Sequence, residues 1–148
     1  MLSESTRMSS AAEARYRVQA PNSLPRVLKV VALDDAGEAV VRHLALGAWK
    51  HATFYSAATF TRNLDEEVGS ADLVVFVAGP GGTARDVEVI GRACSDHRVM
   101  TTALVIGVGT ASDEALSKTL AQIRPWSLMV VIANADDYVS DMLTALRA

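Results

Sequence analysis

The chain has 148 residues, of which 50% are hydrophobic and 21% are charged, and its formal net charge is −3. This length suits one domain with its own core, and the apolar composition indicates an extensive buried sheet or an interface. Because the sequence has no basic stripe to neutralise phosphates, we expect no binding of DNA or RNA. No apolar run approaches the about 20 residues that a membrane span needs. The single cysteine, Cys94, is consistent with a reducing compartment, so we expect a cytoplasmic protein.

Residues 1–25 differ in composition from the rest of the chain. They are rich in Ser, Ala and Arg and lack the apolar core of a secretory signal. We expect a flexible tail that ends at Pro21 and Pro25, with a short amphipathic helix over 11–18 as the alternative. A single domain is then expected over residues 26–148.

Short apolar runs rich in β-branched residues predict the strands. Unbroken apolar runs are typical of parallel strands that helices cover on both faces of the sheet. The segment 59–69 is less regular and is compatible with either a short helix or a loop. The predicted strands are Val27–Leu33, Leu73–Ala78, Ala103–Val108 and Leu128–Ala133, with Thr53–Ala57 as a weaker candidate.

Apolar residues at helical spacing lie between these runs and after the last one. The alternation predicts an α/β domain with a three-layer, mostly parallel, Rossmann-like sheet and helices on both faces. In such a fold ligands bind at the carboxyl ends of the strands, where the strand order reverses. The turns to inspect are therefore 34–37, 79–86, 109–113 and 134–137.

A glycine-rich turn, GPGGT, follows the predicted strand Leu73–Ala78. Glycines allow a ligand to approach the backbone, and free N–H groups at a helix start attract anions. The alternative is a purely structural turn, in which Thr83 caps the next helix and Asp86 completes something like a capping box. The candidate ligand-binding residues are Gly79, Gly81, Gly82, Thr83 and Arg85, together with Asn134 after the last predicted strand.

The turn after the first predicted strand carries Asp34, Asp35, Gly37 and Glu38, within the stretch VALDDAGEAVV. A pair of like charges about 4 Å apart costs about 1–4 kcal/mol near a protein surface, whereas a helix N-terminus contributes only about 0.3–1 kcal/mol. These acids therefore argue against a bound triphosphate. We expect Asp34 or Asp35 to cap the helix that follows.

Other polar residues predict structural roles. Cys94 and His97 have metal-ligand spacing, but no second pair completes a four-ligand site, so we expect no metal. Cys94 also falls on the apolar face of its predicted helix and is expected in the core. Ser112 or Asp113 is expected to cap the next helix, and Asn134 is expected either to cap the last helix or to contact a ligand.

The stretch ADLVVFVAGPGGT, residues 71–83, resembles the strand and signature loop of the tubulin/FtsZ GTPase family. The stretches LKVVALDDAGEAVVRHL, TTALVIGV and LAQIRPWSLMVVIANADDYV are similar to further family segments in the same order, so the likeness covers about residues 27–140. The resemblance implies GTP bound across these turns, with Asn134 in a position that touches the nucleotide. It also implies head-to-tail polymers, in which the next subunit supplies acidic catalytic residues.

The chain departs from this family in three places. The first loop is acidic where the family has glycines, and Ala84-Arg85-Asp86 replaces further glycine and threonine. The sequence also ends before the family's acidic catalytic loop and second domain. We therefore expect a short, degenerate FtsZ-like domain that lacks the C-terminal half, without catalytic residues or GTPase activity.

These observations favour a non-catalytic domain that acts through protein–protein contacts, with a partner or with itself as an oligomer. Trp49 and Trp126 are candidate contact residues, although partial burial within the domain is the favoured explanation for each of them. No cofactor is expected. The alternative is a nucleotide- or small-anion-binding module that uses the Gly79–Thr83 turn, with GTP or another nucleotide as ligand. A third hypothesis is an enzyme that uses Asp34, Asp35 or Asp86 as an acid–base group.

Overall fold

The computed structural model describes residues 26–133 and 136–146. Its strands form one parallel sheet of five strands in the order β2-β1-β3-β4-β5, so the strand order reverses between β1 and β3. This confirms the predicted α/β class with a parallel sheet. The strands are β1 (Leu28–Ala32), β2 (Ala52–Ser56), β3 (Leu73–Ala78), β4 (Met100–Ile106) and β5 (Met129–Ala133).

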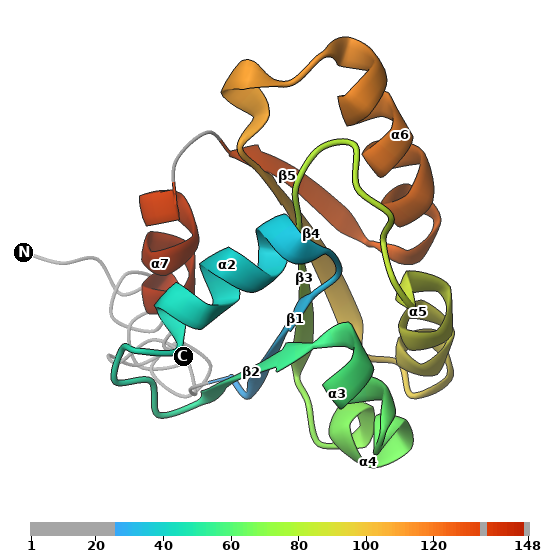
Figure 1. Cartoon of the computed structure of the whole chain (residues 1–148). Helices are drawn as coiled ribbons and strands as arrows, with labels where there is room; N and C mark the ends of the chain where they lie inside the picture. Colours follow the sequence, from blue (N-terminus) through green and yellow to red (C-terminus); the bar gives the residue numbers. More distant parts are fainter. Residues whose placement is uncertain (1–25, 134–135, 147–148) are drawn as a thin grey trace, which may run out of the picture.

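Helices cover both faces of the sheet and form the outer layers of a three-layer domain (Figure 1). One face is covered by α2 and α7, and the other by α3, α4, α5 and α6. The helices are α2 (Asp35–Leu44), α3 (Ala57–Thr61), α4 (Leu64–Gly69), α5 (Val87–Asp96), α6 (Asp113–Ile123) and α7 (Asp136–Ala145), with short 3-10 turns at Val108–Thr110 and Arg124–Trp126. In the part of the chain that the structure describes, no helix combines the length and apolarity needed to cross a membrane.

The predicted strands agree with the structure within a few residues. Leu73–Ala78 has the predicted bounds, and the weaker candidate is a true edge strand, β2. β4 begins earlier than predicted because Thr101 and Thr102, though polar, are buried in the sheet. The less regular segment 59–69 contains most of α3 and all of α4. The predictions for residues 1–25 lie outside the described residues.

The two halves of the sheet are buried to different extents. Every residue of β1 and β3 is buried, as unbroken apolar strands predict. β5 is equally apolar in sequence, yet Met129 is 54% exposed and Ile132 is 48% exposed. The helix that precedes β5, α6, is tied by Thr119 and Gln122 to the turn that follows β3. The expectation of a fully covered strand was therefore wrong for β5.

Candidate functional site

The turns after β1 and β3 meet at the point where the strand order reverses, and the Asp34 side chain joins them. Asp34 is only 6% exposed. Its Oδ1 accepts a hydrogen bond from Gly37 N–H at 2.8 Å, which makes it the N-cap of α2. Its Oδ2 also accepts one from Gly79 N–H at 3.0 Å. The structure thus confirms the predicted cap and assigns it to the first of the two aspartates.

Three glycines permit the close approach of these turns. A Cβ atom on Gly37 would lie 2.1 Å from Val77 O, and one on Gly79 would lie 2.6 Å from Ala36 Cβ. A Cβ on Gly82 would lie 2.7 Å from Asp34 Oδ2. The glycines Gly79 and Gly82 of the turn that resembles a phosphate loop therefore already have a packing role, and the group that Gly82 accommodates is the Asp34 carboxylate.

Helix α6 supplies acceptors for two further N–H groups of the second turn. Gly81 N–H donates to Thr119 Oγ1 at 2.8 Å, and Ala84 N–H donates to Gln122 Oε1 at 2.7 Å. The same two side chains return hydrogen bonds to the turn: Thr119 Oγ1 donates to Gly79 O and Gln122 Nε2 donates to Gly82 O. Two of the four N–H groups in Gly79–Thr83, those of Gly79 and Gly81, are thus engaged within the protein.

The helix after this turn starts later than the sequence predicts. α5 begins at Val87, and its N-cap Asp86 has φ = 59° with no hydrogen bond from its side chain to the helix. Thr83 therefore does not cap α5, and Asp86 does not complete a capping box. The N-terminus of α5 is separated from Gly79–Thr83 by three residues, 84–86, so its dipole does not start at the glycines.

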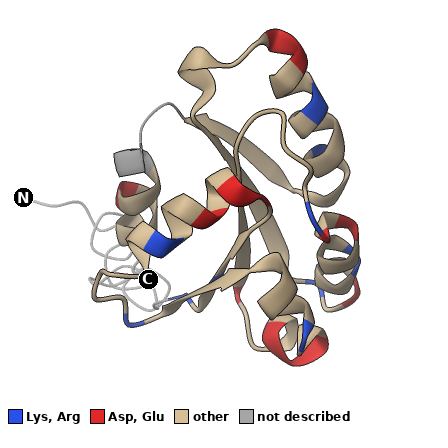
Figure 2. Ribbon diagram, viewed as in Figure 1, with Lys and Arg blue, Asp and Glu red and all other residues tan. Residues whose placement is uncertain are grey.

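Arg85 closes the other side of the site. Its guanidinium donates to Asp35 at 2.5 Å and to Glu38 at 3.3 Å, and the hydrogen bond to Asp35 is the main cause of the raised pKa of Arg85. Figure 2 shows the acidic residues gathered at the start of α2. A cavity of about 380 Å³ remains here, lined by Asp34, Asp35, Ala36, Pro80, Gly82, Thr83 and Arg85.

The chemistry of this cavity is mainly acidic. Asp34 and Asp35 lie on its wall, and Arg85 is the one cation among its lining residues. Gly82 and Thr83 have N–H groups with no acceptor among the residues that the structure describes. Within residues 26–133 and 136–146, no group of at least 3 His, Cys, Asp or Glu residues is placed to hold a metal ion.

The other predicted residues are not brought to this site. Cys94 is buried in the core, where burial raises its pKa to about 12, so its thiol is inert. His97 instead pairs with Asp65 at 3.3 Å on the surface. Ser112 Oγ accepts from Ala115 N–H at 3.1 Å, which confirms it as the cap of α6. Asn134 lies outside the described residues.

Both tryptophans are partly buried within the domain. Trp49 Nε1 donates to Leu44 O at 2.7 Å, and its ring lies 6.3 Å from that of Phe54. The Arg92 guanidinium lies 5.5 Å from the centre of the Trp126 ring. These contacts account for the tryptophans without a partner, as the simpler alternative proposed.

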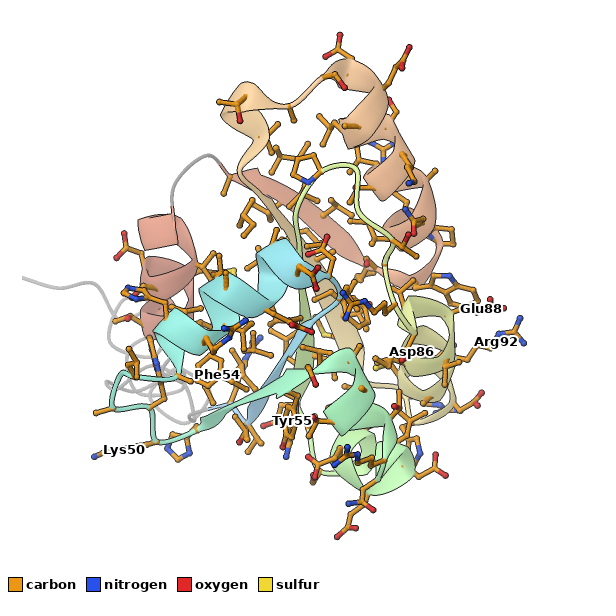
Figure 3. The ribbon with its side chains drawn as sticks, viewed as in Figure 1. Lys50, Phe54, Tyr55, Asp86, Glu88 and Arg92 are labelled. Atoms are coloured by element: carbon orange, nitrogen blue, oxygen red, sulfur yellow. The ribbon has the colours of Figure 1, made fainter. Side chains whose placement is uncertain are left out.

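A partly buried polar cluster on the opposite end of β1 was missed from the sequence. Lys29 Nζ lies 3.0 Å from Glu67 Oε2, and Tyr55 Oη donates to the same oxygen at 2.5 Å; Figure 3 labels Tyr55 beside α4. Burial by itself would lower the pKa of Lys29, but the bonds to Glu67 and Tyr55 outweigh it and the pKa is raised. Lys29 therefore stays protonated and acts as a structural ion pair. The sequence feature that could have indicated this cluster is Lys29, a single lysine within an apolar predicted strand.

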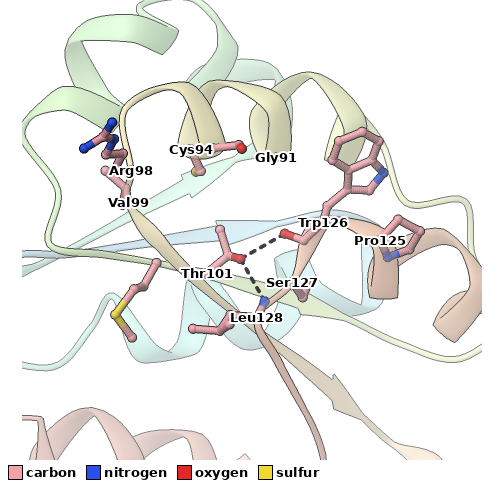
Figure 4. Close-up of a pocket in the computed structure, with 11 residues that line it drawn as sticks. Gly91, Cys94, Arg98, Val99, Thr101, Pro125, Trp126, Ser127 and Leu128 are labelled. Carbon is pink, nitrogen blue, oxygen red and sulfur yellow. Dashed lines mark hydrogen bonds between the residues drawn. The ribbon is translucent and has the colours of Figure 1, made fainter.

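The amino ends of β4 and β5 border a cavity of about 490 Å³ (Figure 4). Thr101 joins two of the segments that line this cavity, because Thr101 Oγ1 donates to Trp126 O at 2.9 Å and accepts from Leu128 N–H at 3.1 Å. Met100 and Leu128 line it and are 51% and 71% exposed. Because this cavity lies at the end opposite the glycine turn, it belongs to a different surface.

Comparison with known proteins adds no relative: no protein-family model and no curated protein matches this chain. The likeness to the tubulin/FtsZ family therefore continues to rest on the residues quoted from the sequence and remains a hypothesis.

Proposed function

We propose that this chain is a non-catalytic, FtsZ-like domain that acts through protein–protein contacts and does not hydrolyse GTP. The proposal is supported chiefly by Asp34, whose carboxylate accepts hydrogen bonds from Gly37 and Gly79 where the two turns meet. An internal carboxylate thus uses the donors that a phosphate group would use. Since Cys94 is a free thiol in the core, we place this function in a reducing compartment such as the cytoplasm.

Electrostatics strengthens the proposal. A triphosphate in the cavity would meet Asp34 and Asp35, at a cost of about 1–4 kcal/mol for each close pair of like charges. Arg85 offers little compensation because Asp35 and Glu38 already share its guanidinium. Displacing Asp34 would in addition leave the N–H of Gly79 without its acceptor.

A role in protein contacts is supported by the distribution of exposed apolar side chains. Among the described residues, four of the six large apolar side chains that are about half exposed or more lie on β5, beside it or at the adjoining end of β4: Met100, Leu128, Met129 and Ile132. The other two, Leu46 and Val89, lie elsewhere. Apolar side chains gathered in one region are typical of interaction surfaces, whereas scattered ones are not.

Isothermal titration calorimetry of the purified chain with GTP and Mg²⁺ tests the absence of a nucleotide site. We expect no heat beyond dilution, and no release of phosphate on prolonged incubation. A dissociation constant in the micromolar range would overturn the proposal. Asp34→Asn is the matched variant: if the carboxylate is what excludes GTP, this neutral side chain is the one that should allow weak binding.

A small-anion site is the second candidate, because Gly82 and Thr83 have N–H groups without acceptors beside Arg85 and the 380 Å³ cavity. Pyrophosphate added to ¹⁵N-labelled protein would then shift the amide signals of Gly82 and Thr83 first. Arg85→Gln should abolish those shifts if the site exists. Shifts that are absent or spread over the whole chain would reject this candidate.

A further inference from the structure

The free edge of β5 differs from the other exposed parts of the molecule. Of the residues named above as exposed and apolar, Met129 and Ile132 belong to β5 itself, while Leu128 precedes it and Met100 starts the neighbouring strand. From Ser127 to Ala133 the chain carries no charged residue, and β5 is free of charge colour in Figure 2. Natural edge strands are usually protected by charges, proline or bulges.

The register of the sheet identifies the main-chain groups at this edge. Leu33 N–H donates to Val77 O, so the main-chain groups of Val77 point toward β1. Val77 aligns with Leu104, and Leu104 aligns with Val131. Since aligned residues of parallel strands point their main-chain groups in the same direction, those of Val131 point inward to β4.

It follows from the alternation that Val130 and Ile132 point their N–H and C=O groups away from the sheet. Neither residue has a backbone hydrogen bond from this side to any residue within 26–133 and 136–146. The strand therefore combines exposed apolar side chains with unpaired main-chain donors and acceptors, which is the chemistry that recognises another strand.

We propose that β5 pairs with β5 of a second copy of this chain, antiparallel about a two-fold axis at Val131, to form a continuous sheet across a homodimer. The inference rests on the proposed role in protein contacts. In this arrangement the N–H of Ile132 donates to Val130 O of the second copy, and the N–H of Val130 donates to Ile132 O. The symmetry repeats both bonds, so all outward groups of both residues are satisfied.

Two features favour a second copy over an unrelated partner. In the antiparallel pairing about Val131, Val130 of one copy lies opposite Ile132 of the other. Their side chains lie on one face and form a β-branched cross-strand pair in the dimer. The uncharged strand also has nothing to repel its own copy, whereas a charged edge would place like charges opposite each other.

The opposite edge strand, β2, lacks these features and provides the control surface. Its residues include the partly buried Phe54 and Tyr55 and the exposed, polar Thr53, but no exposed large apolar side chain. Lys50 and His51 precede it directly. We therefore assign the contact to one edge of the sheet and not to both.

Sedimentation velocity and equilibrium of the full chain, over increasing concentration, test the proposal. The wild-type chain is expected to form a dimer. Ile132→Pro removes an outward N–H that the single copy does not use, so it should keep its circular dichroism spectrum and raise the dimer dissociation constant by at least about 100-fold, for two lost hydrogen bonds. Val131→Pro is the contrasting variant, because it removes an inward N–H and should unfold the chain.

Two further variants keep the test decisive if Ile132→Pro fails to fold. Ile132→Lys places two like charges at the contact and should give a folded monomer, whereas Thr53→Lys on β2 should remain a dimer. A wild-type chain that stays monomeric at the highest concentration, or an Ile132→Lys variant that dimerises as well as wild type, overturns the pairing. Neither result depends on GTP, so failure here is distinct from failure of the proposed function.

Discussion

The junction of the turns after β1 and β3 and the free edge of β5 belong to one sheet but differ in which groups are buried and which are exposed. At the junction, polar groups are buried, and Asp34, Thr119 and Gln122 supply the partners of the main-chain groups. At the β5 edge, apolar side chains are exposed and the outward main-chain groups have no partner within the described residues.

This contrast separates structural features from binding features. A glycine-rich turn looks functional in sequence, but the N–H groups of Gly79 and Gly81 are engaged internally, and neighbouring atoms occupy the space where a Cβ on Gly79 or Gly82 would lie. An apolar strand looks structural in sequence, but only part of it is covered. We therefore expect substitutions at the junction to change the stability of the single copy, and substitutions at the β5 edge to change association.

Among the substitutions at the junction, the largest effect on stability is expected for Gly37→Ala. A Cβ at Gly37 would lie 2.1 Å from the carbonyl oxygen of Val77, and neither backbone can move without disturbing β1 or β3. We expect a loss of more than about 3 kcal/mol in the free energy of unfolding, measured by urea denaturation. Gly69→Ala is the control, since its Cβ would meet only the His97 ring at 3.7 Å and should cost nothing. A well-folded Gly37→Ala variant of wild-type stability would contradict the close approach of the turns.

Asp34→Ala is expected to cost about 2–3 kcal/mol, because it removes the cap of α2 and leaves the N–H of Gly79 without an acceptor. Urea denaturation of this variant should be compared with Asp35→Ala, whose side chain is 89% exposed and should change stability very little. Equal losses in the two variants would mean that Asp34 has no special role at the junction.

Thr119→Val should cost about 1–2 kcal/mol, because the isosteric side chain no longer accepts from Gly81 N–H or donates to Gly79 O. The matched control is Lys118→Ala, which removes only an exposed bond to Gly81 O. Hydrogen exchange of Gly81 should also quicken in Thr119→Val. Unchanged exchange would show that α6 does not hold the turn in solution.

Glu67→Gln tests the polar cluster below the junction and should cost about 1 kcal/mol at neutral pH. The pKa of Glu67 is lowered, first by the hydrogen bond from Tyr55 and then by that from Lys29, so its contribution is lost as pH falls through this lowered value. The pKa of Lys29 is raised above its ordinary value of 10.5, so the contribution of Lys29 to stability is lost as pH rises through this raised pKa.

The stability difference between wild type and Glu67→Gln should therefore be constant between about pH 5 and pH 10 and shrink on both sides. Chemical denaturation across this range measures it. Glu66→Gln on the same helix, whose side chain is exposed, is the control and should show no such dependence. A difference that is independent of pH would argue that the pair contributes through packing rather than charge.

The smallest effect on the single copy is expected for Ile132→Thr. Because Ile132 is 48% exposed and threonine keeps the strand preference, the cost should stay within about 0.5 kcal/mol in dilute solution. Thermal denaturation at low concentration, where the chain is monomeric, provides the measurement. A loss of several kcal/mol would show that Ile132 is part of the core, and would remove the contrast between the two regions.

Several features followed from the sequence because their causes are local. Apolar runs and helical spacing predicted the strands and the α/β class, and the strand Leu73–Ala78 was placed with its observed bounds. Caps at Asp34 or Asp35 and at Ser112 or Asp113 followed from residue type, since a short oxygen-bearing side chain satisfies the first N–H groups of a helix. The structure selects Asp34 and Ser112.

The remaining features depended on neighbours that are distant in the chain. Asp34 and Gly79 are 45 residues apart, and the hydrogen-bonded pairs between α6 and the glycine turn are 38 to 40 residues apart, so no local pattern could reveal these contacts. The late start of α5 and the exposure of β5 likewise depend on where α6 packs. Local propensity thus determined which segments form strands and helices. The tertiary packing of α6 and the two turns decided that the junction after β1 and β3 is occupied by the protein's own side chains, whereas the edge of β5 is left exposed.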